Sequence, residues 1–134
     1  MGGTNYAPVI NEIIKKFGNN SNSSIFGFNK KTEPLIYPVY VIFITDGENS
    51  DKSESEKAII NASHHGVFFQ FIGIGNANFN FLTKLDTMNG RFIDNANFFK
   101  IENLNTKSDD ELYSLLLTEY PQYIVEARSK GLIK

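Results

Sequence analysis

The sequence of 134 residues contains no cysteine, which excludes disulfides, thiolate catalysis and cysteine-based zinc or iron–sulfur sites. A bound metal would have to be held by oxygen ligands or by histidine. Basic residues are not in excess, because 13 Lys and Arg stand against 15 Asp and Glu, for a formal net charge of -2. No stretch gathers the cationic side chains that hold phosphate backbones, so nucleic acid is not expected as a partner.

A long hydrophobic segment is also missing. The longest apolar run, Val39 to Ile44, is far too short to cross a bilayer. The N-terminus lacks the basic region and the following apolar region of a secretory signal. These absences predict a cytoplasmic protein with no membrane partner.

The residues that are present favour one folded domain. Apolar residues make up 41% of the chain and 12 residues are Phe, which is too hydrophobic for a disordered segment. The length suits a single hydrophobic core. We therefore expect residues 1–134 to form a single domain.

Strand-like patterns occur at three places. Residues 37–45 (YPVYVIFIT) are apolar on both alternating faces, which is typical of a central parallel strand covered by helices on both sides. Residues 67–74 repeat this pattern. The Phe-rich residues 91–101 indicate a third strand.

Helix-like patterns alternate with these strands. Apolar residues at helical spacing follow Thr4-Asn5 and end before Gly18. Asp51 and Glu54 stand at capping-box spacing at the start of a second helix, which ends at Gly66. Further helices are predicted over residues 79–85, from Ser108 to Leu117 and from Pro121 to Arg128. The alternation predicts an α/β fold, a three-layer Rossmann-like sandwich with a mainly parallel sheet.

Asp46 is the outstanding candidate for a functional residue. The apolar strand before it leads into Thr45-Asp46-Gly47, so its carboxylate is expected at the carboxyl edge of the sheet, where ligands bind in open α/β folds. We expect water to be partly excluded there, so that a cation would offset the charge, and such oxygen donors suit Mg²⁺ or Mn²⁺. The alternative is that Asp46 only accepts backbone N–H groups of the following turn.

Other polar residues receive structural interpretations. His64-His65 precede a helix-ending glycine and are interpreted as helix-capping residues. Gly73 and Gly75 lack the third glycine of a dinucleotide fingerprint and indicate a tight turn. Asn95 and Asn97 are interpreted as bulge or turn residues rather than ligands.

Four segments occur in an order that resembles a known family. They are Gly2-Gly3-Thr4-Asn5-Tyr6 before a helix, Ile44-Thr45-Asp46-Gly47-Glu48 after a strand, Gly73-Ile74-Gly75, and residues 94–99 (DNANFF). Together they are similar to the von Willebrand factor A-type domains found beside tellurium-resistance genes, and the likeness covers nearly the whole chain. The chain resembles the C-terminal two-thirds of such a domain, which implies a truncated fold lacking the first strands of the A-type domain.

The resemblance implies a partial metal-ion-dependent adhesion site. In this family the site is built from an Asp-x-Ser-x-Ser loop, a threonine from a second loop and an aspartate from a third. Thr4 and Asp46 match the second and third contributions. The one segment with the first spacing, residues 51–55 (DKSES), starts a helix, and we interpret it as an N-cap. Because the first loop is missing, binding of Mg²⁺ or Mn²⁺ is expected to be weak or absent.

The resemblance implies a non-enzymatic protein-binding or adhesion-type module, associated with tellurium resistance or a stress response. Such a module would present the edge around Asp46 and Thr4 to a partner protein. The alternative from another class is a Mg²⁺-dependent phosphohydrolase or phosphotransfer enzyme with Asp46 as nucleophile and Glu48 as its second acid. We expect the protein not to be an enzyme, because no nearby pair of Lys and acid is placed to complete such a site.

A third hypothesis concerns assembly. In the family, the first strand lies beside the strand that matches residues 37–45. Without it, residues 37–45 become a sheet edge with unpaired backbone groups. This predicts either a homo-oligomer formed through strand 37–45 or a complex with a separate N-terminal polypeptide that carries the missing loop.

Overall fold

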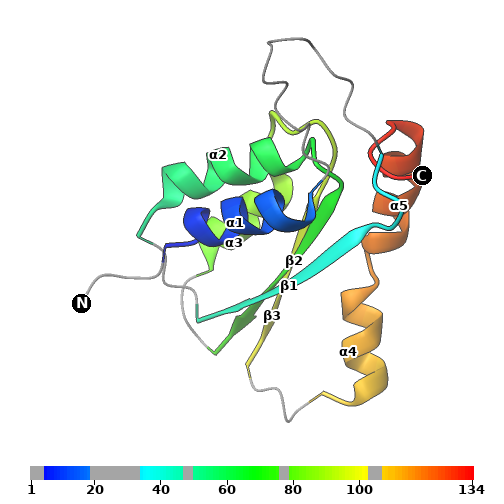
Figure 1. The fold of residues 1–134 in the computed structure, drawn as a ribbon. Helices are drawn as coiled ribbons and strands as arrows, with labels where there is room; N and C mark the ends of the chain where they lie inside the picture. The colour runs from blue at the N-terminus through cyan, green and yellow to red at the C-terminus, as the bar shows by residue number, and fades with distance from the viewer. Residues whose placement is uncertain (1–4, 19–33, 47–49, 76–78, 103–106) are drawn as a thin grey trace.

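The computed structural model describes residues 5–18, 34–46, 50–75, 79–102 and 107–134. Strands and helices alternate as the sequence predicts, and two helices close the chain (Figure 1). The elements are α1 (Ala7–Phe17), β1 (Val39–Thr45), α2 (Lys52–Ala62), β2 (Val67–Ile74), α3 (Asn80–Thr87), β3 (Ala96–Ile101), α4 (Asp109–Leu116) and α5 (Tyr120–Ser129). Among the described residues, no helix has both the length and the apolar character needed to span a membrane.

The three described strands form one sheet in the order β1-β2-β3, and both strand pairs are parallel. Val39 pairs with Val67 and Thr45 pairs with Gly73, so β1 and β2 run side by side along the whole of β1. The predicted α/β fold with a parallel sheet is confirmed. The predicted central strand, residues 37–45, instead lies at an edge of the described sheet, because β2 is the strand that has a neighbour on each side.

Helices cover both faces of the sheet and give three layers (Figure 1). On one face, side chains of α1, α2 and α3 enclose Phe69 and Phe71 of β2. On the other face, Tyr123 of α5 packs against Phe68 of β2, with a distance of 5.1 Å between ring centroids. Burial of one such aromatic side chain stabilises a fold by about 1.5–3 kcal/mol. The aromatic residues of β2 therefore hold both helical layers to the sheet.

β1 is less covered than its sequence predicts. Its side chains Val41 and Phe43 pack against the core formed with α1, α2 and α3. On its opposite face Tyr40 contacts Tyr120 of α5, but further along that face the side chain of Ile42 is 48% exposed and Ile44 is 59% exposed. The prediction that helices cover both faces of this strand is therefore wrong for its second half.

The third strand is shorter than predicted, because β3 begins at Ala96 and residues 91–95 precede it as a loop. The side chain of Arg91 organises this loop. Its guanidinium donates hydrogen bonds to the carbonyl oxygens of Asp86 and Met88, at 2.9 and 3.2 Å, and to the carboxylate of Asp94 at 3.0 Å. The apolar residues inside the loop resemble a strand in sequence, but side chains supply partners for its backbone: the N–H of Phe92 donates to the hydroxyl of Ser63 at 2.9 Å, and the carbonyl oxygen of Phe92 accepts from Lys130 at 2.6 Å.

Candidate functional site

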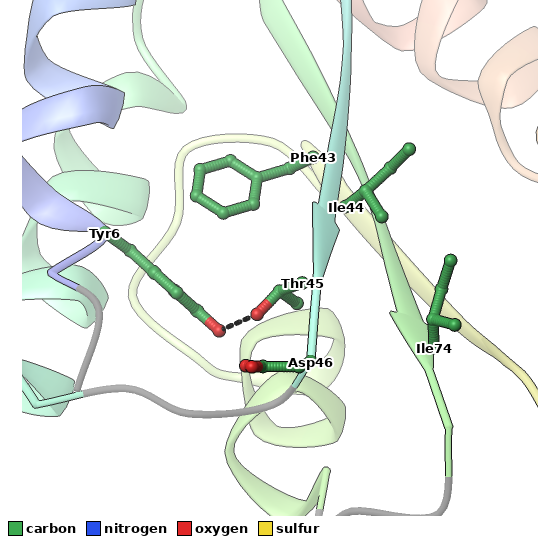
Figure 2. Close-up of a pocket in the computed structure, with 6 residues that line it drawn as sticks. All are labelled: Tyr6, Phe43, Ile44, Thr45, Asp46 and Ile74. Atoms are coloured by element: carbon green, nitrogen blue, oxygen red, sulfur yellow. Dashed lines mark hydrogen bonds between the residues drawn. The ribbon is translucent and has the colours of Figure 1, made fainter.

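The carboxyl end of β1 and the start of α1 meet beside a pocket of about 390 Å³ (Figure 2). We call it the rim pocket, and it is lined by Tyr6, Phe43, Ile44, Thr45, Asp46 and Ile74. Since β1 and β2 are parallel, their carboxyl ends lie at the same edge of the sheet, which is where ligands bind in open α/β folds. The location that the sequence predicts for the candidate site, at the end of β1, thus coincides with the rim pocket.

Tyr6 fixes the start of α1 against the end of β1. Its side chain is fully buried, and its ring packs on Phe43 with 4.9 Å between centroids. Its phenolic oxygen forms a hydrogen bond with the hydroxyl of Thr45, in which either oxygen can donate (Figure 2). The role of Tyr6 in this contact is not evident from the sequence, although a tyrosine just before a helix and a threonine at the end of a strand are both suited to it.

Asp51 holds the same region from the side of α2. Its carboxylate accepts hydrogen bonds from the backbone N–H groups of Tyr6 and Ala7, both at 2.9 Å, and from the hydroxyl of Ser55 at 2.9 Å. The first-turn N–H groups of a helix lack partners within the helix, and a carboxylate there also interacts favourably with the helix dipole. Asp51 therefore stabilises the N-terminus of α1.

The N-cap interpretation of residues 51–55 needs correction. Asp51 stands at the N-cap position of α2, yet its side chain makes no capping hydrogen bond to α2. The carboxylate instead binds the first turn of a different helix, whose residues lie 44 and 45 positions away in the sequence. Partial burial acts to raise the pKa of Asp51, but the hydrogen bonds from Tyr6, Ala7 and Ser55 outweigh it and hold the pKa below its usual value.

The two predicted metal ligands have different outcomes. Asp46 follows β1 directly and lines the rim pocket, on the same side of the strand as the hydroxyl of Tyr6 (Figure 2). Its side chain is exposed, so the expectation that water is partly excluded around it is wrong. Thr4 lies outside the described residues, as does Glu48. Tyr6, two residues after Thr4, is held beside Thr45, which precedes Asp46.

Gly73 and Gly75 have separate roles at this edge. Gly75 adopts a φ of 97°, which agrees with the predicted tight turn. Gly73 lies within β2, and a Cβ atom there would come within 2.6 Å of the ring of Phe79. The missing side chain of Gly73 therefore makes room for Phe79 at the start of α3.

The asparagines of the third strand region are structural. Asn95 is fully buried and donates from Nδ2 to the carbonyl oxygen of Ile59 at 3.1 Å, which ties the loop before β3 to α2. Asn97 is a regular residue of β3, not a bulge, and its Nδ2 donates to Oε1 of Gln70 at 3.2 Å. Both amides are engaged within the fold and are away from the rim pocket.

Comparison with known proteins gives a match over almost the full sequence. Residues 1–133 match the family vWA-TerF-like, described as the vWA found in TerF C terminus. The chain is 45% identical over 129 residues to Uncharacterized protein YcbR of Bacillus subtilis (strain 168), an alignment that covers 92% of this chain and 52% of YcbR. The chain thus spans about half the length of this curated relative.

Replacement of Asp51 by alanine is expected to destabilise the fold by about 1–3 kcal/mol, because two first-turn N–H groups of α1 lose their acceptor. The pKa of Asp51 is lower in the folded chain than in the unfolded chain. The stabilisation that ionised Asp51 contributes is therefore fully present above the pKa that this residue has in the unfolded chain. It is lost as the pH falls through the lower pKa that Asp51 has in the folded chain. Urea denaturation of the wild type and Asp51→Ala at several pH values measures both effects.

The matched control for Asp51 is Glu54→Ala, which removes an exposed carboxylate from the first turn of α2. This change should alter stability by no more than about 0.5 kcal/mol. Equal losses in the two variants, or a loss in Asp51→Ala that persists unchanged at acid pH, would contradict the assigned role of Asp51.

Proposed function

Since the chain belongs to the vWA-TerF-like family, the von Willebrand factor A domains found at the C terminus of TerF, we propose that it is a non-enzymatic protein-binding module. Its contact surface comprises the rim pocket and the adjoining free edge of β1. One observation carries this proposal: Ile42 and Ile44 are 48% and 59% exposed on one face of β1, and Ile44 lines the rim pocket together with the exposed residue Asp46.

The composition of this surface suits a protein partner. Ile42 and Ile44 offer apolar area, while Thr45 and Asp46 offer polar groups at the border of that area. Protein interfaces combine an apolar centre with a polar border in this way. The partner would cover the two isoleucines and place a hydrogen-bond donor on the carboxylate of Asp46.

The free edge of β1 supplies a second means of contact. Among the described strands, β1 pairs with β2 alone, so the backbone groups on its other side have no strand partner in the described part of the chain. Such an edge is a template for a strand from another polypeptide. We propose that a second copy of this chain occupies it. A separate polypeptide that carries an Asp-x-Ser-x-Ser loop is the alternative occupant.

The described residues do not fit a resident Mg²⁺ or Mn²⁺ ion at the rim pocket. Asp46 is the one carboxylate among the residues that line the pocket, and the hydroxyl of Thr45 is engaged with Tyr6. The carboxylate of Asp51 accepts three hydrogen bonds of its own. The proposed contact therefore involves no metal step, and weak binding of Mg²⁺ or Mn²⁺ at Asp46 stays a prediction.

The phosphohydrolase hypothesis has less support than the binding hypothesis. Phosphoryl transfer needs positive groups placed to stabilise the charge on the transferred phosphoryl oxygens. The described residues that line the rim pocket include no Lys, Arg or His. Asp46 has the position of a nucleophile but lacks, among these residues, the cationic surroundings that such a role requires.

The family also gives the proposal a biological setting. The likeness to domains found beside tellurium-resistance genes supports a role in tellurium resistance or a related stress response, as part of a cytoplasmic protein assembly. In that setting the chain contributes a contact surface and another component carries out the chemistry.

A phosphatase assay separates the binding hypothesis from the enzyme hypothesis. With a generic phosphate ester and Mg²⁺, we expect no turnover above background, and the same result for Asp46→Asn, because the described lining of the pocket offers no basic side chain to stabilise the transition state. Turnover that disappears in Asp46→Asn would overturn the binding proposal in favour of the enzyme.

Calorimetric titration with Mg²⁺ and Mn²⁺ tests the predicted metal role of Asp46. We expect weak heats or none, since one exposed carboxylate keeps most of its water. Any binding at the rim pocket should vanish in Asp46→Ala. Tight binding that vanishes in Asp46→Ala would show that the rim pocket holds a metal. It would contradict our conclusion that the described residues of the pocket do not fit a resident ion.

Solution mass measured over a range of concentrations tests self-association through β1. The wild type should form dimers or larger assemblies as the concentration rises, and Ile42→Lys with Ile44→Lys should shift the chain to monomer by placing charges on the contact surface. Val125→Lys is the matched control, because Val125 is 62% exposed on α5, far along the chain from β1. A wild type that stays monomeric at every concentration, or equal behaviour of the two variants, would contradict this proposal.

A further inference from the structure

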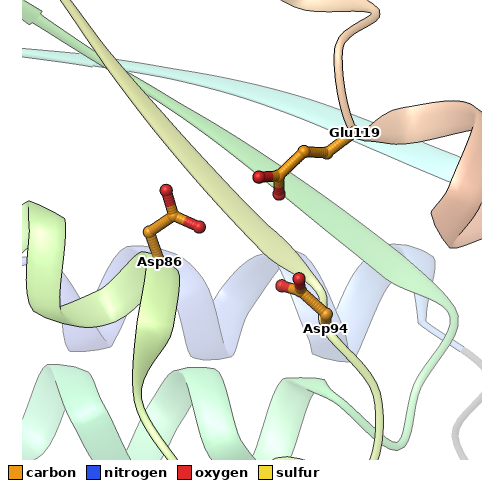
Figure 3. Close-up of side chains that lie close together, drawn as sticks. All are labelled: Asp86, Asp94 and Glu119. Atoms are coloured by element: carbon orange, nitrogen blue, oxygen red, sulfur yellow. The ribbon is translucent and has the colours of Figure 1, made fainter.

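Three carboxylates converge at a place that the proposed function does not use. Asp86 lies near the end of α3, Asp94 lies in the loop before β3, and Glu119 lies just before α5 (Figure 3). One carboxylate oxygen of each residue lies within 4.8 Å of the corresponding oxygens of the other two. We call these residues the carboxylate cluster. It precedes β3, whereas the rim pocket lies where β1 ends, so the two places are at opposite ends of the parallel sheet.

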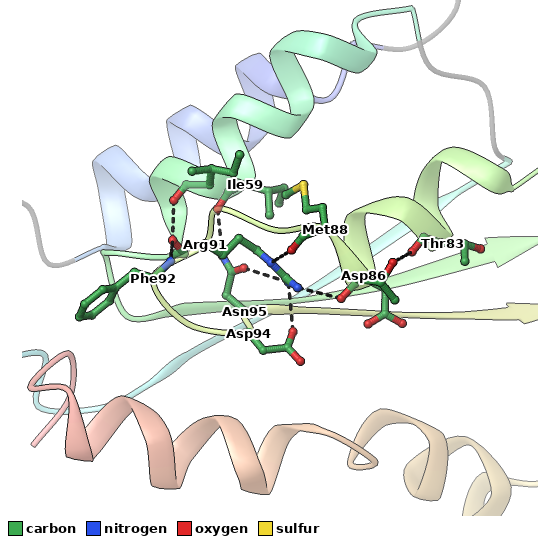
Figure 4. Close-up of polar contacts among 11 residues, drawn as sticks. Ile59, Thr83, Asp86, Met88, Arg91, Phe92, Asp94 and Asn95 are labelled. Atoms are coloured by element: carbon green, nitrogen blue, oxygen red, sulfur yellow. Dashed lines mark hydrogen bonds and ion pairs between the residues drawn. The ribbon is translucent and has the colours of Figure 1, made fainter.

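The cluster has more negative charge than its surroundings offset. The side chain of Arg91 is only 8% exposed and forms an ion pair with Asp94 at 3.0 Å. Its guanidinium also donates hydrogen bonds to the side chain of Asn95 and to the carbonyl oxygens of Asp86 and Met88 (Figure 4). Three carboxylates against one guanidinium leave two negative charges when all are ionised. A divalent cation carries the charge that would balance them.

Two buried oxygen atoms beside the cluster lack hydrogen-bond partners. Oε2 of Glu119 is sealed from solvent and has no partner among the described residues. The hydroxyl of Tyr123, a residue that is 2% exposed, also has none. Both residues line, with Asp94, Gln122 and Glu126, a cavity of about 250 Å³. Buried polar atoms almost always have a partner, so these two oxygens require one from outside the described chain, which an ordered water molecule or an ion with its waters would supply.

The protonation behaviour of the cluster agrees with a shortage of positive charge. Burial, together with the negative charges of Asp86 and Asp94, raises the pKa of Glu119 to about 7, while Arg91 opposes the shift. Burial and the charge of Asp94 likewise raise the pKa of Asp86, against the hydrogen bond from the amide of Phe98. Carboxyl groups this close to one another resist ionising together unless a cation lies between them.

We propose that Asp86, Asp94 and Glu119 form a binding site for a divalent cation with oxygen ligands, of the size of Ca²⁺. A Ca²⁺ ion lies about 2.3–2.6 Å from each oxygen, so its ligand atoms can be up to about 5 Å apart, whereas Mg²⁺ at about 2.1 Å needs a tighter set. With separations of up to 4.8 Å, the three carboxylate oxygens can surround the larger ion after small side-chain rotations. The side chain of Asp94 is 53% exposed, which leaves a path for the ion and its remaining waters.

The site is independent of the proposed protein-binding function, and its ligands come from the end of α3, the loop before β3 and the residue before α5. Asp86 and Asp94 belong to the layer and loop next to β3, while Glu119 begins the helix on the other face of the sheet. A bound ion would therefore connect the two helical layers directly.

Terbium binding tests the site in the full chain. Tb³⁺ substitutes for Ca²⁺ and emits light when a nearby tyrosine passes on its excitation, and Tyr123 lines the cavity in a chain that has no tryptophan. After treatment with a chelator, we expect saturable emission that excess Ca²⁺ displaces. Glu119→Gln and Asp94→Asn should each weaken binding by at least about ten-fold. Asp110→Asn, an exposed carboxylate in the first turn of α4, should bind as the wild type does.

Two further measurements keep the outcome clear. Asp46→Ala should retain the emission, since that carboxylate lies at the other end of the sheet. Loss of emission in this variant alone would assign the ion to the rim pocket and overturn the proposal.

Without metal, Glu119→Gln should melt at or above the wild-type temperature, because it removes a carboxylate that its neighbours repel. With Ca²⁺, the wild type should melt higher and Asp94→Asn should not. No saturable emission, or equal binding by Asp94→Asn and Asp110→Asn, would overturn the proposal.

Discussion

The contact between the carboxylate of Asp51 and the first turn of α1 is the interaction on which the candidate contact surface depends. It places a negative charge where the unpaired N–H groups of α1 converge, at distances of 2.9 Å. One of these N–H groups belongs to Tyr6, whose phenolic oxygen forms a hydrogen bond with the hydroxyl of Thr45. Through these steps, a residue of the loop before α2 determines where the start of α1 lies relative to Asp46.

Much of the fold could be predicted from local patterns. The residues of β2, apolar except for Gln70 and flanked by helical periodicity, predict a parallel strand buried on both faces, and the structure shows it. Ser108 caps α4 as its sequence predicts, by accepting a hydrogen bond from the amide of Glu111 at 3.2 Å. The position of Asp46 at the end of β1 also follows from sequence, because a residue after a parallel strand lies at the carboxyl edge of the sheet.

The features that sequence analysis missed depend on contacts between distant parts of the chain. Asp51 has the spacing of a local capping box, but nothing near it in the sequence identifies its actual partner, 45 residues away. The strand-like residues 91–95 form a loop whose backbone is hydrogen-bonded by the side chains of Ser63 and Lys130, 29 and 38 positions from Phe92. The carboxylate cluster combines residues 86, 94 and 119, which form no spacing pattern and come together because α3, β3 and α5 pack on the same sheet.

Gly73 connects the geometry of the two ends of the sheet. It lies on β2 opposite Thr45, and the ring of Phe79 occupies the volume that a side chain would fill. Phe79 immediately precedes α3, and Asp86 is near the far end of that helix. A methyl group at position 73 would displace the ring of Phe79, and any movement that the ring passes on to α3 would reach Asp86. The absence of a single side chain beside the contact surface thus gives space to the residue from which the helix carrying Asp86 begins.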